Sequence, residues 1–463
     1  MRRFYFLHMR HIGRLLAAAL AVLAAFSLAI QPAAAQSILR DAETEALLHD
    51  LATPLIKAAG LDPANVSVVL VGDPSINAFV AGGQTVYINS GLIGAADNAN
   101  EVQGVIAHEL GHITGGHVIA ASQGSKEATG VTILSLVLAG LAAAAGAGDA
   151  AMGVAMAGQR AALGKYLAFT RGQESAADAA GATFLSKAGI SGKGSIAFFK
   201  KLQNMQFRYG YSPKPDDEFI STHPLTGDRI ANLEQVYKVD PAWNTPEDPK
   251  LEARFQRVKA KLEGYIDTPQ ETLRDYPPSD QSIPAHYARA YAYHKEALTD
   301  QAIAETDALI KAEPDDPYFL ELEGQILLES GKPAEAIPPL RKATQLSNNS
   351  PLIATLFGHA LIATEDPSHY DEAEQVLRYA VARDRDNPFA WYQLGVVYAA
   401  KGDMPRARLA SAEQQSMNGQ YMQALRSAQA AQAGLPENSP DWIRAQDIEF
   451  EARQALEQNK GRS

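Results

Sequence analysis

The chain has 463 residues, which is enough for two to three domains and a large buried core. Its formal net charge of -12 argues against binding to nucleic acid and against docking to anionic lipid through charge. The sequence contains no cysteine, which excludes disulfide bonds, catalysis by a cysteine nucleophile and a lipid attached to an N-terminal cysteine.

Residues 1–35 are typical of a signal peptide. Arginines at positions 2, 3, 10 and 14 form a basic start, an apolar run extends from Leu15 to Ile30, and three alanines end at Ala35. We expect cleavage between Ala35 and Gln36, which would change the formal charge from -12 to -16 by removing the four arginines. The alternative is an uncleaved anchor, because the apolar run is near the upper length for a signal segment.

Residues 36–240 are expected to form an α+β domain with a small sheet. A helix is expected from about Asp41 to Ala59, and two short strands follow, at Ser67–Val71 and Gln84–Ile88. A further helix is expected from about Ala99 to Gly115. This helix carries the most informative motif of the chain.

The motif is His108-Glu109-Leu110-Gly111-His112. Residues four apart on a helix project from nearly the same face, so both imidazoles can bind one zinc ion. Glu109 is placed to accept a proton from water that zinc has acidified to a pKa of about 7. An apolar face flanks the motif and argues against a chance match; it consists of Val102, Val105, Ile106 and Leu110. The pattern predicts the zinc helix of a metalloprotease.

Zinc needs a third protein ligand, and the first candidate is His117. In a continuous helix His117 would point away from His108 and His112. Gly115-Gly116 could break the helix, as happens in enzymes with the pattern H-E-x-x-H-x-x-G-x-x-H. That pattern requires histidine at position 118, where this chain has valine. The register therefore disfavours His117 as a ligand.

A weakly hydrophobic segment follows at residues 128–158. Residues 128–147 contain no charge and are rich in small apolar residues, and the pattern resumes after Asp149. Twenty such residues could span a bilayer, but the alanine and glycine content favours a helical hairpin packed beside the active site. The segment is also a candidate for peripheral contact with a membrane.

Two further candidates for the third ligand lie downstream. Glu174 and Asp178, in the sequence RGQESAAD, share a helix face at a spacing of four, next to small residues that permit close packing. A carboxylate ligand and a second carboxylate that orients a ligand histidine would fit this arrangement. The remaining candidate is His223, in the sequence STHPLTGDR.

HELGH, RGQESAAD and STHPLTGDR resemble, in this order, the motifs of the gluzincin peptidases that include the CAAX prenyl endopeptidases, the heat-shock protease HtpX and the BepA-like proteases. The resemblance implies a single zinc ion with His108, His112 and Glu174 as ligands, Glu109 as the catalytic base and Asp178 beside the ligands. It also implies that Asn77–Leu92 forms a hairpin and edge strand to which an extended substrate could add.

The same resemblance covers His223 and Arg229, which match the family pattern H-P-x-x-x-x-R. Two roles remain open for His223. It could stabilise the oxyanion, or it could occupy the fourth position on zinc and keep the enzyme latent.

Residues 241–282 are expected to form a linker with one helix near Leu251–Tyr265, and residues 283–463 a tetratricopeptide-repeat domain. Pro317 and Pro351 are 34 residues apart, and Pro388 follows 37 residues later. Small residues recur in register within these units, namely Gly324, Gly358 and Gly395, and Ala336, Ala373 and Ala407. An earlier unit begins at Ile283, and one more helix pair is expected towards the C-terminus.

With these repeats the chain resembles the BepA-like beta-barrel assembly-enhancing proteases over nearly its whole mature length. The resemblance implies a mainly α, periplasmic zinc endopeptidase that cleaves misassembled outer-membrane proteins, with the repeats binding clients or the assembly machinery. Two alternatives remain. One is a chaperone or adaptor whose zinc site is latent, and the other is a peptidase for small exported peptides.

Overall fold

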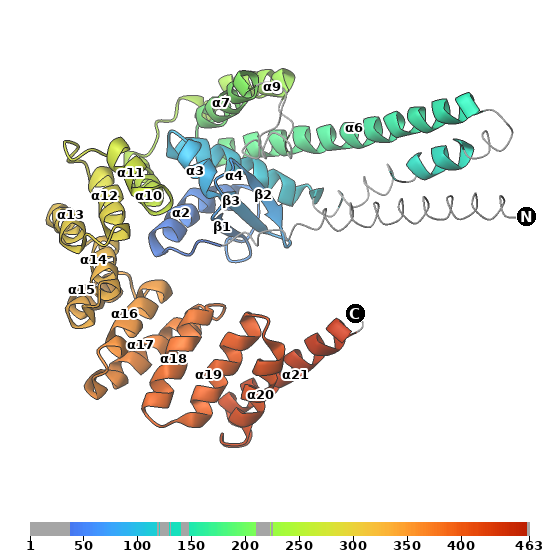
Figure 1. Ribbon diagram of the computed structural model, residues 1–463. Coiled ribbons are helices and arrows are strands. Elements are labelled where there is room, and N and C mark those ends of the chain that lie inside the picture. Colours follow the sequence, from blue (N-terminus) through green and yellow to red (C-terminus); the bar gives the residue numbers. More distant parts are fainter. Residues whose placement is uncertain are drawn as a thin grey trace, which may run out of the picture. The chain divides into compact units, whose positions relative to one another are not determined.

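The computed structural model describes residues 38–117, 120, 129, 131–139, 148–209, 223 and 226–460. The chain divides into two compact units between Ile38 and Leu39, and almost all described residues belong to the second unit. The expected fold class is confirmed, because the chain is mainly helical with a small sheet (Figure 1). The expected signal peptide and its cleavage site lie outside the described residues.

The sheet has three strands in the order β1-β3-β2. The strands are β1 (Ser67–Val71), β2 (Ala78–Ala81) and β3 (Thr85–Asn89), so β1 has the expected bounds and β3 is shifted by one residue. β1 is parallel to β3, with Val69 opposite Tyr87, and β2 is antiparallel to β3, with Phe79 opposite the same Tyr87. β2 is therefore an edge strand among the described residues.

Five helices surround this sheet before the repeats begin. They are α2 (Ala42–Ala58), α3 (Ser90–Ala95), α4 (Ala99–Thr114), α7 (Lys193–Tyr209) and α9 (Gly227–Lys238), and the long helix α6 (Gly148–Ala188) joins them. α4 is the expected zinc helix, and the side chain of Asn98 caps its N-terminus by accepting a hydrogen bond from the amide of Glu101.

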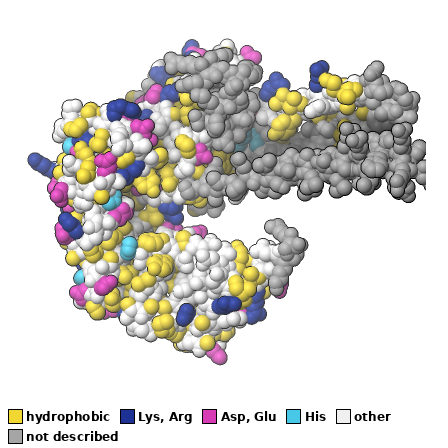
Figure 2. All heavy atoms as spheres, in the orientation of Figure 1, with side chains coloured by type: hydrophobic (Ala, Val, Ile, Leu, Met, Phe, Trp, Pro, Cys, Tyr) yellow, Lys and Arg dark blue, Asp and Glu magenta, His cyan; other side chains and the backbone are white. Residues whose placement is uncertain are grey.

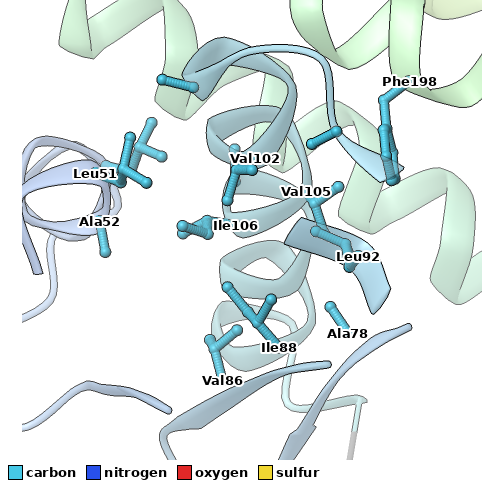
Figure 3. Close-up of a cluster of buried hydrophobic side chains, with 14 of the residues drawn as sticks. Leu51, Ala52, Ala78, Val86, Ile88, Leu92, Val102, Val105, Ile106 and Phe198 are labelled. Atoms are coloured by element: carbon cyan, nitrogen blue, oxygen red, sulfur yellow. The ribbon is translucent and has the colours of Figure 1, made fainter. Parts of the chain in front are cut away.

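α4 lies in the middle of the core, and its residues 99–112 are all buried. Val102, Val105 and Ile106 of α4 contact apolar side chains from the sheet and from neighbouring helices (Figure 3). The labelled neighbours are Leu51 and Ala52 of α2, Ala78 of β2, Val86 and Ile88 of β3, Leu92 of α3 and Phe198 of α7. The helix with the HELGH motif is thus held from several sides at once.

Glycines allow α4 and α6 to pack closely. A Cβ atom at Gly111 would lie 2.6 Å from the carbonyl oxygen of Ala177, and one at Gly181 would lie 3.0 Å from that of Ala107. Distances this short exclude larger side chains at these positions unless the helices move apart. This close approach brings the carboxylates of α6 next to the histidines of α4.

The expected hairpin at residues 128–158 is described only in part. Residues 131–139 are helical, and the second arm is the start of α6, which continues without a break to Ala188. The two arms pack closely at Gly158, because an added Cβ atom there would lie only 1.9 Å from the Cβ of Ser135. None of the described helices is both long and apolar enough to cross a membrane.

The expected linker is more structured than one helix. It contains a 3-10 helix, η2 (Pro241–Asn244), and two α-helices, α10 (Pro249–Ile266) and α11 (Pro269–Asp275). The second helix forms because Thr268 and Glu271 make a reciprocal capping box at its N-terminus. Phe255 and Val258 of α10 are buried in the same core as α4, so this segment packs against the first domain.

Five helix pairs follow within residues 283–460. They are α12 (Ile283–Lys295) with α13 (Thr299–Ala312), α14 (Pro317–Glu329) with α15 (Pro333–Leu346), α16 (Pro351–Ala363) with α17 (Tyr370–Arg383), α18 (Pro388–Ala400) with α19 (Met404–Met417), and α20 (Tyr421–Gln432) with α21 (Pro440–Lys460). A short 3-10 helix, η3 (Pro367–His369), occupies the insertion of the middle unit. The recurring glycines lie at helix crossings, since Cβ atoms at Gly324 and Gly358 would meet Leu340 and Leu377.

A buried network of charged groups connects α2 with α10 and the first repeats. Tyr287 of α12 donates a hydrogen bond of 2.7 Å to Glu43 of α2, and Arg257 of α10 also binds Glu43. Arg257 in addition lies 2.9 Å from Asp316 at the start of α14. Buried charges require such partners, so the network fixes these elements to one another.

Candidate metal centre

Four buried side chains converge on one point beside α4. The Nε2 atoms of His108 and His112 lie 3.1 Å apart. Glu174 of α6 reaches both histidines, with its oxygens 3.4 Å from Nε2 of His108 and 3.5 Å from Nε2 of His112. His223 completes the group, and one ligand atom from each residue lies within 4.8 Å of all the others.

The spacing of four along each helix produces this convergence. His108 and His112 project from one face of α4, and Glu174 and Asp178 project from one face of α6, as expected. Asp178 lies one turn beyond Glu174, and its Oδ1 is 3.0 Å from Nδ1 of His108. A carboxylate in this position holds an imidazole so that the other ring nitrogen, Nε2, faces the centre.

His223 enters the group from the segment before α9. Its Nδ1 is 3.2 Å from both carboxylate oxygens of Glu174 and 3.4 Å from Nε2 of His108, and its Nε2 is 3.6 Å from Glu109. The imidazole therefore lies between the proposed third ligand and the proposed base.

Arg229 lies in the first turn of α9, where the side chain of Thr226 caps the helix. Its guanidinium donates two hydrogen bonds to Asp178, of 2.7 and 2.8 Å, and also lies 3.1 Å from Glu174. All three side chains are buried. All the residues predicted from the sequence are therefore in one cluster.

Glu109 differs from the other carboxylates of the centre. Both of its oxygens are buried, and among the described residues neither has a hydrogen-bond partner. Burial raises the pKa of Glu109, against the attraction of His223 and His108. A buried carboxylate whose nearest cationic group, His223, lies 3.6 Å away and makes no hydrogen bond to it is costly unless a further group contacts it.

The electrostatics of the centre favour a cation. Burial alone would lower the pKa of His108, but contacts with Asp178 and Glu174 raise it to about 10. Burial and the neighbouring His108 lower the pKa of His112 to about 2. Two imidazoles and a carboxylate that converge in this way are a donor set that fits a catalytic divalent metal.

His117 is outside the group of possible ligands but contacts one of them. Its Nδ1 lies 2.9 Å from Nδ1 of His112, on the side of that ring away from the centre. The sequence could not reveal this contact, because it depends on the path of the chain after α4. The only local signal was the pair Gly115-Gly116.

A cavity of 340 Å³ opens onto the centre. Its lining includes Glu109, His112, Glu174 and His223, and it also includes Phe79 and Val80 of the edge strand β2. The aromatic residues Tyr166 and Phe169 of α6 complete one wall. These aromatic residues were not predicted, since nothing in the local sequence distinguishes them from ordinary helix residues.

Comparisons with known families match residues 40–237 to peptidase family M48. Residues 366–416 match the tetratricopeptide repeat, and residues 295–380 match subunit 3 of the anaphase-promoting complex (cyclosome). The His108, His112, Glu174 and His223 cluster lies entirely within the peptidase match.

Individual relatives agree with these matches. The beta-barrel assembly-enhancing protease of Escherichia coli (strain K12) is 27% identical over 384 residues, covering 82% of this chain and 76% of that protein. The protein of the same name from Yersinia pestis is 28% identical and covers 77% and 72% of the two chains. The mitochondrial metalloendopeptidase OMA1 of Bos taurus is 24% identical over 50% of this chain and 44% of its own. The chain is therefore a metallopeptidase with a family M48 domain and C-terminal tetratricopeptide repeats, homologous over most of its length to beta-barrel assembly-enhancing proteases.

Proposed function

We propose that this chain is a periplasmic zinc endopeptidase that cleaves misfolded or misassembled envelope proteins. The observation that carries the proposal is the convergence of His108, His112 and Glu174 beside the buried carboxylate of Glu109, which has no hydrogen-bond partner among the described residues. The names of the relatives support the client class, since they describe proteases that enhance beta-barrel assembly.

In this proposal His108, His112 and Glu174 hold one zinc ion, which when bound supplies Lewis acidity to a water molecule and a peptide carbonyl. Glu109 lies on the cavity wall and accepts the proton of the attacking water. Asp178 orients His108 through its contact with Nδ1. Arg229 neutralises Asp178 and Glu174 and keeps both carboxylates in place.

Two roles are open to His223, and its position is compatible with each. It lies close enough to Glu109 to donate to the oxyanion that forms on the scissile carbonyl. It also belongs to the convergent group of four, so it can act as a fourth ligand that excludes water. The presence of His223 in this group is the observation that favours the alternative function, a chaperone or adaptor with a latent zinc site.

The edge strand β2 suggests how a substrate is held. β2 pairs with β3 along one side, and its residues Phe79 and Val80 line the cavity that contains Glu109. An extended peptide that adds to the side of β2 that no other described strand covers would run across this cavity. Phe79, Tyr166 and Phe169 would then receive an apolar side chain of the substrate.

We assign residues 36–240 to the catalytic domain, residues 241–282 to the connecting segment and residues 283–463 to a repeat domain that binds clients or the assembly machinery. A groove in the repeats is lined by Tyr392, Val396, Ala399 and Met404, among others, and has a volume of 260 Å³. Such a groove fits an apolar peptide side chain.

Contact with a membrane at residues 128–158 is part of the proposal. Large apolar side chains are exposed on residues 131–139 and on the start of α6; they are Ile133, Leu134, Leu136, Val137, Leu138, Met152 and Met156. Figure 2 shows apolar side chains with basic ones among them along the projecting part of α6. Exposed apolar patches of this kind mark contact with a membrane or another protein.

The test is metal content and casein cleavage of the purified chain, compared with Glu109→Gln and His223→Ala. The proposal expects one zinc per chain and cleavage by the wild type, with zinc retained but cleavage reduced about 100-fold or more in Glu109→Gln. Faster cleavage by His223→Ala would identify His223 as a restraint, and slower cleavage would place it at the oxyanion. A chain that holds no zinc when supplied with it would contradict the proposal and favour the scaffold function.

A further inference from the structure

A turn after α4 brings a further histidine, His117, against the ligand His112, on the wall of the cavity that opens onto the metal centre. α4 ends at Thr114, and Gly115 and Gly116 form the turn that leads to His117. The imidazoles of His112 and His117 then meet with their Nδ1 atoms 2.9 Å apart, at an angle of 77° between the ring planes. This contact lies on the opposite edge of His112 from Nε2, which faces the centre.

Both glycines are needed for this path. A Cβ atom at Gly115 would lie 2.3 Å from Nε2 of His117, which is too close for any other residue while the ring keeps its position. Gly116 has a φ of +63°, in the left-handed region that residues with side chains rarely adopt. The side chain of Gln173 on α6 holds the far side of the turn by donating to the carbonyl of His117 at 3.4 Å.

The donor and the acceptor in this contact are fixed once His112 binds a metal through Nε2. A neutral imidazole whose Nε2 lone pair is used for ligation carries its proton on Nδ1. That proton requires an acceptor, and Nδ1 of His117 is the atom within hydrogen-bond distance. His117 must then carry its own proton on Nε2, which faces away from His112.

We propose that His117 is a positioning residue that accepts the Nδ1 proton of His112 and so fixes the tautomer and ring orientation of that ligand. The inference rests on the proposed metal site. With His117 in this role, each ligand histidine has an orienting group at Nδ1: Asp178 beside His108, and His117 beside His112. The two groups differ in charge, since one is a carboxylate and the other a neutral imidazole. His117 therefore orients its ligand without adding negative charge to the centre.

The test is the zinc affinity of the purified full chain, measured by competition with a chelator of known affinity. His117→Phe keeps a ring but removes the acceptor, and it should weaken zinc binding about 10-fold to 100-fold. His117→Asn places an amide oxygen close to the position of Nδ1 and should restore most of the affinity. His49→Phe, at an exposed histidine of α2, is the matched control and should bind zinc like the wild type.

A second pair of measurements separates orientation from folding. The absorption spectrum of the cobalt-substituted chain should change in His117→Phe and return in His117→Asn, while the melting temperature of the metal-free protein stays the same in both. Gly115→Ala, which displaces the ring without removing it, should weaken zinc binding to a similar degree. Combining it with His117→Phe should add little, because both changes remove the same hydrogen bond.

The outcomes distinguish this inference from the proposed function. If the wild type binds no zinc, the metal site and the role of His117 fail together. If the wild type binds zinc and His117→Phe binds it equally well, only the role of His117 fails. Equal loss of affinity in His117→Phe and His117→Asn would also overturn it, because the size of the side chain and not the acceptor would then matter.

Discussion

Arg229 and Asp178 form a buried bidentate ion pair, with Nε of Arg229 2.7 Å from Oδ2 of Asp178 and Nη2 2.8 Å from Oδ1. Each side chain is only 7% exposed. The pair joins the first turn of α9 to the helix that carries Glu174, and His223 lies on the segment just before α9. The position of His223 at the metal centre therefore depends on this contact.

Replacing Arg229 by alanine should destabilise the chain by about 3–5 kcal/mol, because Asp178 is left buried without its cation. Arg229→Lys should recover part of this loss, since lysine keeps the positive charge but cannot form the bidentate pair of hydrogen bonds. Chemical denaturation measures both changes. Lys200→Ala, which breaks an exposed pair with Glu234, is the control and should have little effect. Comparable effects of Arg229→Ala and Lys200→Ala would contradict the prediction.

Gly111→Ala should separate α4 from α6, because its Cβ atom would lie 2.6 Å from the carbonyl oxygen of Ala177. We expect a loss of about 1–3 kcal/mol in the free energy of unfolding and weaker metal binding, since Glu174 moves with α6. Gly172→Ala is the matched control on α6, where an added Cβ atom meets nothing within 4 Å. That change should stabilise the helix by up to about 1 kcal/mol. A Gly111→Ala chain as stable as the wild type would show that the helices can relax.

The stability of the chain should depend on pH through Glu321 of α14. This residue is partly exposed, but its Oε2 atom is buried and has no hydrogen-bond partner among the described residues. Burial, against the attraction of Lys261, raises its pKa to about 8. Between pH 4.5 and about 8 the folded chain therefore holds a proton that the unfolded chain releases, so stability falls as the pH rises through this range.

Glu321→Gln removes this dependence, because the amide stays uncharged. The difference in the free energy of unfolding between variant and wild type should grow in favour of the variant from pH 5 to pH 8, by on the order of 2–4 kcal/mol. Denaturation curves at several pH values measure it. Glu335→Gln, on the exposed side of α15, serves as the control. A constant difference across the range would mean that Glu321 is ionised in the folded chain.

Contact with a membrane should depend on the exposed side chains of residues 131–139. Replacing Ile133, Leu134 and Val137 by serine should abolish sedimentation with vesicles of zwitterionic lipid, while zinc content is unchanged. Replacing Val239 and Phe450, which are more exposed than these three residues, by serine is the control for general surface hydrophobicity. Wild-type chain that stays in the supernatant would rule out this contact and leave a protein partner for the surface.

The local parts of the structure could be predicted from the sequence. The bounds of β1, the helix that became α4 and the prolines that begin α14, α16 and α18 all follow from short-range patterns. The approach of Glu174 and Asp178 to α4 was also expected, because the family resemblance supplied the long-range pairing. Periodicity alone left Glu174, His117 and His223 as open alternatives.

Contacts set by the path of the chain could not be predicted. The position of His117 depends on the left-handed backbone at Gly116, which no residue spacing in the sequence specifies. The network around Glu43 joins residues more than 200 positions apart, where no sequence spacing relates the partners. The helix that begins after Thr268 was not anticipated, because the surrounding prolines and charges indicated a linker.

α6 is one uninterrupted helix of 41 residues, and it carries exposed apolar side chains near its start and Glu174 near its end. From Met156 to Glu174 the rise of the helix corresponds to about 27 Å. If this segment of α6 moves as a rigid body, a rotation of about 4° about one end displaces the other end by about 2 Å. If the proposed contact at the apolar end occurs, a lipid or client bound there would also shift Glu174, and adsorption would be coupled to the metal centre through a single helix.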